Sequence, residues 1–218
     1  MKIKAILTGA TGMVGEGVLH ECLQHRDLEH VLVVGRRSCG VSHSRLREIL
    51  VGDFFDLSSI QNQLLGYNAC FFCLGVSSIG MKEPEFYKLT YELTTYFATT
   101  LVARNPEMTF CYISGAGTNE NGRMMWARVK GKTESDLTRL GFAHVYNFRP
   151  GIIKPTKGLK NTLSFYNYLG WLIPVIKLIA PAKVCSLREI GMAMINAASK
   201  GYRKQVLEVT DIVALSKE

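Results

Sequence analysis

Three glycines at intervals of three residues stand near the amino terminus, in the run TGATGMVG at positions 8–15. Gly9 permits a tight turn, Gly12 lets backbone amides approach an anion directly, and Gly15 lets a following helix pack closely. The free N–H groups and positive end of that helix favour negative charge. The pattern predicts a diphosphate-binding turn, rather than a glycine-rich turn without a ligand. The expected contacts come from Gly9, Thr11, Gly12, Met13, Val14 and Gly15, with the Thr8 hydroxyl in addition.

Two arginines follow the next apolar run, VLVVGRRS. Arg36 and Arg37 stand where a Rossmann-type chain meets the ribose of a bound dinucleotide, about 20 residues beyond the glycines. An acidic residue there would bind the 2′-hydroxyl of NAD, whereas arginine pairs with the 2′-phosphate of NADP. We therefore predict that NADP, as NADPH, is preferred over NAD. The alternative is that one or both arginines are solvated surface charges.

The segment VGDFFDL, residues 51–57, carries residues suited to an adenine ring. Asp53 can accept a hydrogen bond from the adenine amino group, and Phe54 can contact the ring. Asp53 could instead cap a helix that begins near Leu57, but Asp56 is better placed for that role. We expect Asp53 and Phe54 to bind the cofactor.

Two later segments are expected to run beside the dinucleotide. Leu74 and Gly75 follow the run NACFFC, and Gly75 permits a close backbone approach. The sequence FRPGII should turn the backbone past the nicotinamide end. Arg149, which opens that turn, could instead bind a neighbouring carboxylate. The turn residues expected to contact the cofactor are Pro150, Gly151 and Ile152.

Short apolar runs alternate with segments of helical length along the whole chain. Most of these runs end in a glycine, as in KIKAILTG, HVLVVGR, NACFFCLG, MTFCYISG and HVYNFRPG, and helical stretches such as 12–25 and 83–104 separate them. Such alternation is typical of a doubly wound parallel sheet with helices on both faces. We predict an α/β fold of the Rossmann type, with residues 1–218 as a single domain. Ligands bind beyond the carboxyl ends of such strands.

One long apolar segment, LSFYNYLGWLIPVIKLIAPA at residues 163–182, stands outside this pattern. Asn167, Pro174 and Lys177 interrupt it, which argues against a transmembrane helix. We expect residues 155–185 to form a small apolar cover over the substrate cleft. A peripheral membrane contact or a protein contact through residues 163–182 is the alternative.

The formal charge of +8 favours anionic partners, yet the basic residues are scattered and form no nucleic-acid-reading motif. We therefore expect a small-molecule substrate and no nucleic acid. Cys70 and Cys73 fall on opposite faces of a strand, and the histidines lack metal-binding spacing, so no metal site is expected. Buried thiols and the absence of a signal peptide favour a reducing, cytoplasmic location.

Together, TGATGMVG, the strand end at Arg36, GDFFDL, CLG, YISGAG and FRPG resemble the atypical branch of the short-chain dehydrogenase/reductase superfamily, in that family's order. The resemblance covers roughly residues 3–155 and is strongest to the Tat-interacting-protein type of oxidoreductase. It implies a Rossmann fold, NADP(H) binding and redox chemistry, often on a carbonyl group.

The resemblance also implies a catalytic set, a serine followed by Tyr-x-x-x-Lys. Ser114 and Lys130 match the serine and lysine, but Trp126 occupies the tyrosine position. An indole N–H donates a hydrogen bond but does not ionise usefully, so Trp126 cannot replace the general acid. We expect Ser114 to bind a substrate carbonyl, Trp126 to wall the substrate, and Lys130 to hold the nicotinamide ribose. Other candidate proton donors, by residue type alone, are Tyr87, Tyr91, Tyr112, Tyr166 and Tyr168.

Two functions remain open. The first is an NADP(H)-dependent oxidoreductase that transfers hydride to a small carbonyl, quinone or flavin. The second is a catalytically silent NADP(H)-binding sensor or scaffold that acts through a protein or membrane partner. Turnover, rather than binding, separates the two.

Overall fold

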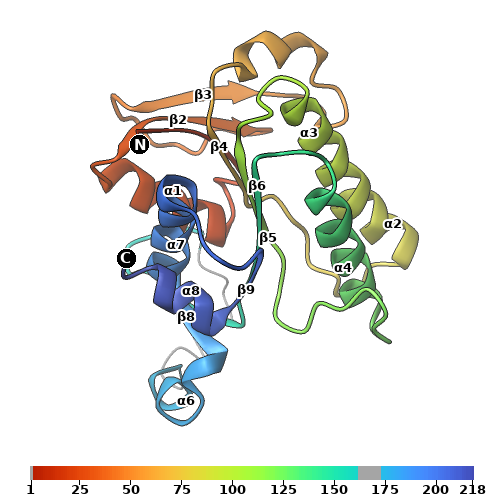
Figure 1. Ribbon diagram of the computed structural model, residues 1–218, viewed down its shortest axis with the longest axis vertical. Coiled ribbons are helices and arrows are strands. Elements are labelled where there is room, and N and C mark those ends of the chain that lie inside the picture. The colour runs from red at the N-terminus through yellow and green to blue at the C-terminus, as the bar shows by residue number, and fades with distance from the viewer. Residues whose placement is uncertain (1, 162–172) are drawn as a thin grey trace.

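The computed structural model describes residues 2–161 and 173–218, and for Pro174 and Val175 it describes the backbone only. Its centre is a parallel sheet with the strand order β3-β2-β1-β4-β5-β6-β9 (Figure 1). The strands are β1 (Ile3–Thr8), β2 (Leu28–Gly35), β3 (Leu46–Leu50), β4 (Ala69–Phe72), β5 (Thr109–Ile113), β6 (His144–Arg149) and β9 (Val206–Glu208). The order reverses beside β1, and that is where ligands bind in doubly wound sheets.

Helices cover both faces of the sheet, as predicted (Figure 1). One face carries α1 (Met13–Gln24), α7 (Leu187–Lys200) and α8 (Val209–Leu215), and the other carries α3 (Leu93–Val102) and α4 (Met125–Thr138). The two layers explain the uninterrupted apolar runs of the strands. In β1, Ile3, Ala5 and Leu7 join the core under α1 and α7, whereas Ile6 joins the core under α3.

The predicted continuous helix over residues 83–104 contains a π-helical turn. It begins as α2 (Glu83–Tyr87), widens into the π turn Lys88–Glu92, and continues as α3. The backbone N–H of Leu93 donates to the carbonyl of Lys88, five residues earlier. Such bulges are rare and concentrate at functional sites.

Several short elements went unpredicted from the sequence. Strand β9 has three residues and is the edge strand of the main sheet, beside β6. Strands β7 (Ile152–Lys154) and β8 (Val184–Ser186) form a separate parallel pair. The 3-10 segment Pro181–Lys183 is likewise short, whereas the 3-10 segment Ser58–Leu64 stands where a helix was expected to begin near Leu57. Elements of three residues carry too little periodicity to be recognised in a sequence.

The apolar cover expected over residues 155–185 lies partly outside the described residues, which do not include residues 162–172. Its described part includes α6 (Ile173–Ile179), which lies at one end of the long axis of the molecule (Figure 1). Within the described residues, no helix combines the length and the hydropathy needed to cross a membrane.

Cys70 and Cys73 lie on opposite faces of the sheet, as strand alternation predicts. Cys70 belongs to the core under α3, and Cys73 packs against the core under α1. Burial raises the pKa of both thiols well above its usual range. Both cysteines therefore serve as apolar packing residues.

Candidate functional site

The glycine-rich turn between β1 and α1 is held by close backbone contacts. Gly9 has a φ of +72°, and the Gly12 N–H donates to the Gly9 carbonyl at 2.9 Å. A Cβ atom on Gly15 would lie 2.1 Å from the Gly9 carbonyl oxygen. Gly9 and Gly15 therefore have to be glycine for steric reasons: Gly9 for its backbone conformation and Gly15 for helix packing.

The first turn of α1 presents unpaired backbone donors. Gly12 is the N-cap, and no side chain caps the helix. The first N–H groups of a helix have no intrahelical partner, and the helix dipole adds partial positive charge there. This end of α1 can therefore bind an anionic group.

Thr8, whose hydroxyl is expected to add a contact to the ligand, makes a structural hydrogen bond. Its side chain is fully buried, and its Oγ1 accepts a hydrogen bond from the Leu74 N–H at 3.2 Å. This bond links the end of β1 to the chain after β4. Thr11, by contrast, lines the cavity beside the turn.

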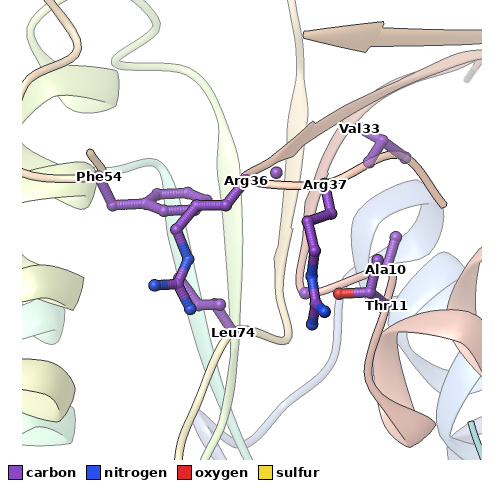
Figure 2. Close-up of a pocket in the computed structure, with 9 residues that line it drawn as sticks. Ala10, Thr11, Val33, Arg36, Arg37, Phe54 and Leu74 are labelled. Carbon is purple, nitrogen blue, oxygen red and sulfur yellow. The ribbon is translucent and has the colours of Figure 1, made fainter. Parts of the chain in front are cut away.

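Arg36 and Arg37 enter this cavity from the end of β2. Figure 2 shows the two side chains running in the same direction, with Arg37 beside Thr11 and Arg36 beside Phe54 and Leu74. Both residues are exposed, and neither guanidinium donates a hydrogen bond to any described residue. Two unpaired cations therefore border the glycine turn. The lining residues are Gly9, Ala10, Thr11, Val33, Gly35, Arg36, Arg37, Phe54 and Leu74.

A second, more apolar cavity continues past Arg36. Phe54 is buried and packs against Phe97, with ring centroids 6.0 Å apart. Asp53 is exposed, and one of its carboxylate oxygens accepts from the Phe55 N–H at 2.9 Å. Its other oxygen has no partner among the described residues. The lining residues are Arg36, Gly52, Asp53, Phe54, Phe55, Leu74, Gly75, Val76, Leu89 and Leu93.

Leu89 and Leu93 are lining residues that sequence reasoning missed. They come from the π turn and the start of α3, far along the chain from the other residues of this cavity. Their spacing of four residues was the available signal, since it places both side chains on one helical face. Asp56, the better-placed candidate for a helix cap, accepts from the Ser58 N–H at 3.0 Å, although the N-cap position of the 3-10 segment is Leu57.

Ser114, Trp126 and Lys130 come together where β5 ends. Lys130 Nζ donates to the Ser114 carbonyl at 3.0 Å and to the Ile113 carbonyl at 3.4 Å. The Trp126 ring lies against the loop after Ser114, since a Cβ atom on Gly117 would meet it at 3.5 Å. Helix α4 thus presents Trp126 and Lys130 to the same loop, as their spacing predicts.

The Lys130 ammonium lies in a desolvated position, although the residue as a whole is only partly buried. Desolvation lowers its pKa to about 8, while the nearby Glu134 carboxylate acts in the opposite direction. An ammonium group has three N–H donors, of which two point at carbonyls. The third N–H has no hydrogen-bond acceptor among the described residues, and the ammonium lies 5.6 Å from the centre of the Tyr112 ring.

Two of the candidate tyrosines, Tyr112 and Tyr91, are engaged within the fold. Tyr112 is fully buried on β5, and burial raises its pKa above the usual range. Tyr91 donates to Asp136 at 2.8 Å, and its ring lies 4.7 Å from that of Tyr87. The remaining candidates, Tyr166 and Tyr168, lie outside the described residues.

The turn after β6 is largely engaged in structural contacts. The Pro150 carbonyl accepts from the Ala116 N–H at 3.0 Å, and Ile152 begins β7. A Cβ atom on Gly151 would lie 2.5 Å from the Lys183 carbonyl oxygen. Arg149 binds neighbouring carboxylates, which confirms the alternative role given to it from the sequence. Its two shortest contacts are to Glu134, at 2.5 Å and 3.0 Å.

The seven-stranded parallel sheet with helices on both faces defines a fold of the Rossmann type, and comparison with solved structures specifies the architecture further. A short-chain dehydrogenase/reductase from Brucella melitensis superimposes with a TM-score of 0.70 at 15% identity, covering 94% of this chain and 96% of that one. The Bordetella bronchiseptica enzyme WbmF, solved with NAD⁺, gives a TM-score of 0.69 at 14% identity, covering 99% and 77%. The chain has the fold of the short-chain dehydrogenase/reductase superfamily.

Curated relatives match in sequence over most of the chain. Protein FMP52-1, mitochondrial, of Scheffersomyces stipitis is 25% identical over 214 residues, covering 93% of this chain and 91% of that protein. Protein FMP52, mitochondrial, of Candida albicans is 23% identical over 223 residues, covering 97% and 94%. No protein-family profile matches the chain. The expected cytoplasmic location is contradicted, because these relatives are named as mitochondrial proteins.

Proposed function

We propose that the protein binds NADPH in preference to NADH and transfers hydride to a small carbonyl, quinone or flavin. The observation that carries this proposal is the first turn of α1, which has no side-chain cap and opens beside two arginines that are unpaired among the described residues. The diphosphate would lie against the N–H groups of this turn, where Gly12 has no side chain to obstruct it. Arg36 and Arg37 would hold the 2′-phosphate, and Asp53 and Phe54 would hold the adenine.

The other end of the cofactor would lie along the carboxyl ends of β4, β5 and β6. Leu74 and Gly75 would run beneath it, and Gly151 and Ile152 would flank the nicotinamide. When bound, the nicotinamide supplies the hydride. The free donor of Lys130 would hold the ribose hydroxyls, and Ser114 would bind an oxygen of the hydride acceptor.

Trp126 limits the chemistry in the way its sequence position implies. Its indole offers a wall beside Gly117 and no ionisable proton. A reduction that needs a proton from a tyrosine is therefore disfavoured. Flavins and quinones are the favoured acceptors, because hydride delivery to them needs no dedicated phenol.

Calorimetric titration with NADPH and NADH, followed by NADPH oxidation assays on carbonyl, quinone and flavin panels, tests the proposal. We expect tight NADPH binding and turnover with at least one panel. Binding without turnover would favour the sensor function, and failure to bind either nucleotide would refute both functions.

The Lys130 pKa leads to a pH prediction. Lysine is charged below its pKa, so a value of about 8 means that the charge is lost between pH 7 and 9. We expect NADPH affinity to fall about 3- to 10-fold as pH rises from 7 to 9.5, because the ribose loses a charge-assisted hydrogen bond. Isothermal titration at each pH measures this.

Two variants serve as controls for that pH prediction. Lys130→Met removes the titrating group, so its NADPH affinity should be weaker than that of the native chain and independent of pH. Lys130→Arg stays charged throughout, so its NADPH affinity should not fall as the pH rises. The NADP 2′-phosphate titrates near pH 6, outside the measured range. An unchanged slope in both variants would assign the titration to another group.

A partner contact is favoured by two exposed apolar side chains at the end of α6. Leu178 is 84% and Ile179 is 77% exposed, and exposed lysines such as Lys154 and Lys183 stand on the neighbouring segments. We infer contact with an anionic membrane surface, consistent with the mitochondrial names of the relatives. Sedimentation with anionic vesicles, compared between the native chain and Leu178→Ser/Ile179→Ser, tests it. Equal sedimentation would reject the contact.

A further inference from the structure

Each of the three segments that follow β4, β5 and β6 exposes a large apolar side chain. Ile79 is 90% exposed, Met124 is 57% exposed and Ile152 is 38% exposed. The three strands are parallel neighbours, so these segments leave the sheet at the same edge. That edge is where the nicotinamide end of the cofactor would lie.

Helix α6 extends this apolar edge beside the glycine-rich turn. Met13, the first residue of α1, packs with Ile173 and Val184, so α6 is attached directly to the turn. The other end of α6 carries Leu178 and Ile179, which are both largely exposed. Figure 1 shows α6 and the loop that leads into α4 toward the same end of the long axis. The name apolar rim is used below for Ile79, Met124, Ile152, Leu178 and Ile179.

The opposite edge of the sheet differs from the apolar rim. Among the described residues, the segments that lead into β4, β5 and β6 expose one large apolar side chain, that of Leu65. Single exposed apolar side chains are normal on protein surfaces, whereas a set of them on adjoining segments marks an interaction surface. The apolar rim is therefore a contact surface at the acceptor end of the proposed cofactor site.

Lysines accompany the rim in the chain beyond β6. The described stretches 150–161 and 173–186 contain five lysines and no acidic residue. Four of these lysines are exposed, namely Lys154, Lys157, Lys160 and Lys183. The fifth, Lys177, pairs with Glu189 at 3.2 Å. Exposed lysines beside apolar side chains match an anionic bilayer, because the ammonium groups meet lipid phosphates while the apolar groups enter the acyl boundary.

We propose that the hydride acceptor is a lipid-soluble quinone, which reaches the carboxyl ends of β4, β5 and β6 from an anionic bilayer across the apolar rim. This inference rests on the proposed oxidoreductase function and on the proposed membrane contact, and it narrows three acceptor classes to one. Such a quinone joins a polar ring to a long apolar chain. The rim supplies apolar contact for that chain, which a small carbonyl compound or a flavin does not need.

The reaction balances with one proton from solvent. The quinone accepts a hydride, with its two electrons, from C4 of the dihydronicotinamide of NADPH, so one C–H bond breaks and one O–H bond forms. The second quinone oxygen takes a proton from water, and the products are NADP⁺ and the hydroquinone. Because this proton comes from solvent, the indole of Trp126 at the tyrosine position does not block the step.

Quinones that share a ring and differ in their tail test the proposal. NADPH oxidation is measured with tail-free ubiquinone-0, decylubiquinone and flavin mononucleotide, each with vesicles of phosphatidylcholine and phosphatidylglycerol. We expect kcat/KM for decylubiquinone to exceed that for ubiquinone-0 at least about 10-fold, since burial of the apolar tail favours the tailed quinone. This advantage should fall with vesicles of phosphatidylcholine alone, because the lysines lose their anionic partners.

The variant Ile79→Ser/Met124→Ser tests the rim itself. Neither side chain belongs to the proposed cofactor or acceptor contacts, so the Kd of NADPH and kcat with ubiquinone-0 should change less than about 2-fold. The KM for decylubiquinone in vesicles should rise about 10-fold or more, because two apolar contacts are lost. Leu50→Ser/Leu65→Ser is the matched control, since it removes two apolar side chains of 57% and 51% exposure away from the rim and should leave these constants unchanged.

The remaining outcomes would overturn the proposal. Equal kcat/KM for the two quinones in the native chain would do so, and so would an equal loss with both quinones in Ile79→Ser/Met124→Ser. Reduction of flavin mononucleotide and of neither quinone would also do so, while the oxidoreductase function would stand. Rim variants that change only the oligomeric state would assign the rim to contact between copies of this chain. If the native chain binds NADPH but oxidises it with none of the three probes, the proposed enzymatic function fails first, and this proposal fails with it.

Discussion

Replacing Gly15 by alanine is expected to abolish dinucleotide binding and to destabilise the fold. The added Cβ atom would lie 2.1 Å from the Gly9 carbonyl oxygen and 2.4 Å from its carbon. Both are backbone atoms of the turn, so the clash can be relieved only by separating α1 from β1. We expect a loss of about 2–3 kcal/mol or more in unfolding free energy, the upper range for overpacking.

The loss of binding follows from the same displacement. The N–H groups of the first turn of α1 must point at one diphosphate, and a shifted helix no longer directs them there. Losing two charge-assisted bonds, each worth about 1.5–3 kcal/mol, weakens NADPH binding more than about 100-fold. Urea unfolding and calorimetric titration measure the two effects.

Gly12→Ala is the matched control for Gly15→Ala. A Cβ atom on Gly12 would lie 3.4 Å from the Gly9 carbonyl oxygen, which is an ordinary contact, and its φ of −107° suits alanine. Stability should therefore change by at most about 1 kcal/mol, as for other substitutions at an N-cap. Binding should still fall, because the methyl group occupies the position of the diphosphate. Undiminished NADPH affinity in Gly12→Ala would place the cofactor elsewhere.

Removing both arginines at the end of β2 is expected to abolish the preference for NADPH. Arg36 and Arg37 are exposed and unpaired among the described residues, and both side chains enter the cavity beside the glycine turn (Figure 2). A charge-assisted bond to phosphate is worth about 1.5–3 kcal/mol, or about 10- to 150-fold in Kd. We expect Arg36→Ala/Arg37→Ala to raise the Kd of NADPH at least about 10- to 150-fold and the Kd of NADH about 3-fold or less.

The single variants then assign the roles of the two arginines. Arg36 lies beside Phe54, so Arg36→Ala should weaken both nucleotides through lost contact with the adenine. Arg37 lies beside Thr11, so Arg37→Ala should act mainly on NADPH. Arg26→Ala, at an exposed arginine in the turn that leads into the amino end of β2, is the control for net charge. Equal losses for NADPH and NADH in the double variant would exclude a 2′-phosphate contact.

Local sequence patterns sufficed for the fold class and for the glycine-rich turn between β1 and α1. Alternation within single strands placed Cys70 and Cys73 on opposite faces, and continuous apolar runs indicated a sheet covered on both sides. The glycines of the first turn form a local sequence pattern at intervals of three residues, which can be recognised without the fold. In the fold, Gly15 is constrained by Gly9.

Contacts between residues distant in sequence depended on the folded chain. Thr8 bonds to Leu74, Arg149 bonds to Glu134, and Leu89 reaches the cavity through a π turn. Periodicity reports which face a side chain occupies. Hydrogen-bond partners are chosen by tertiary packing, which brings together groups that no local pattern relates.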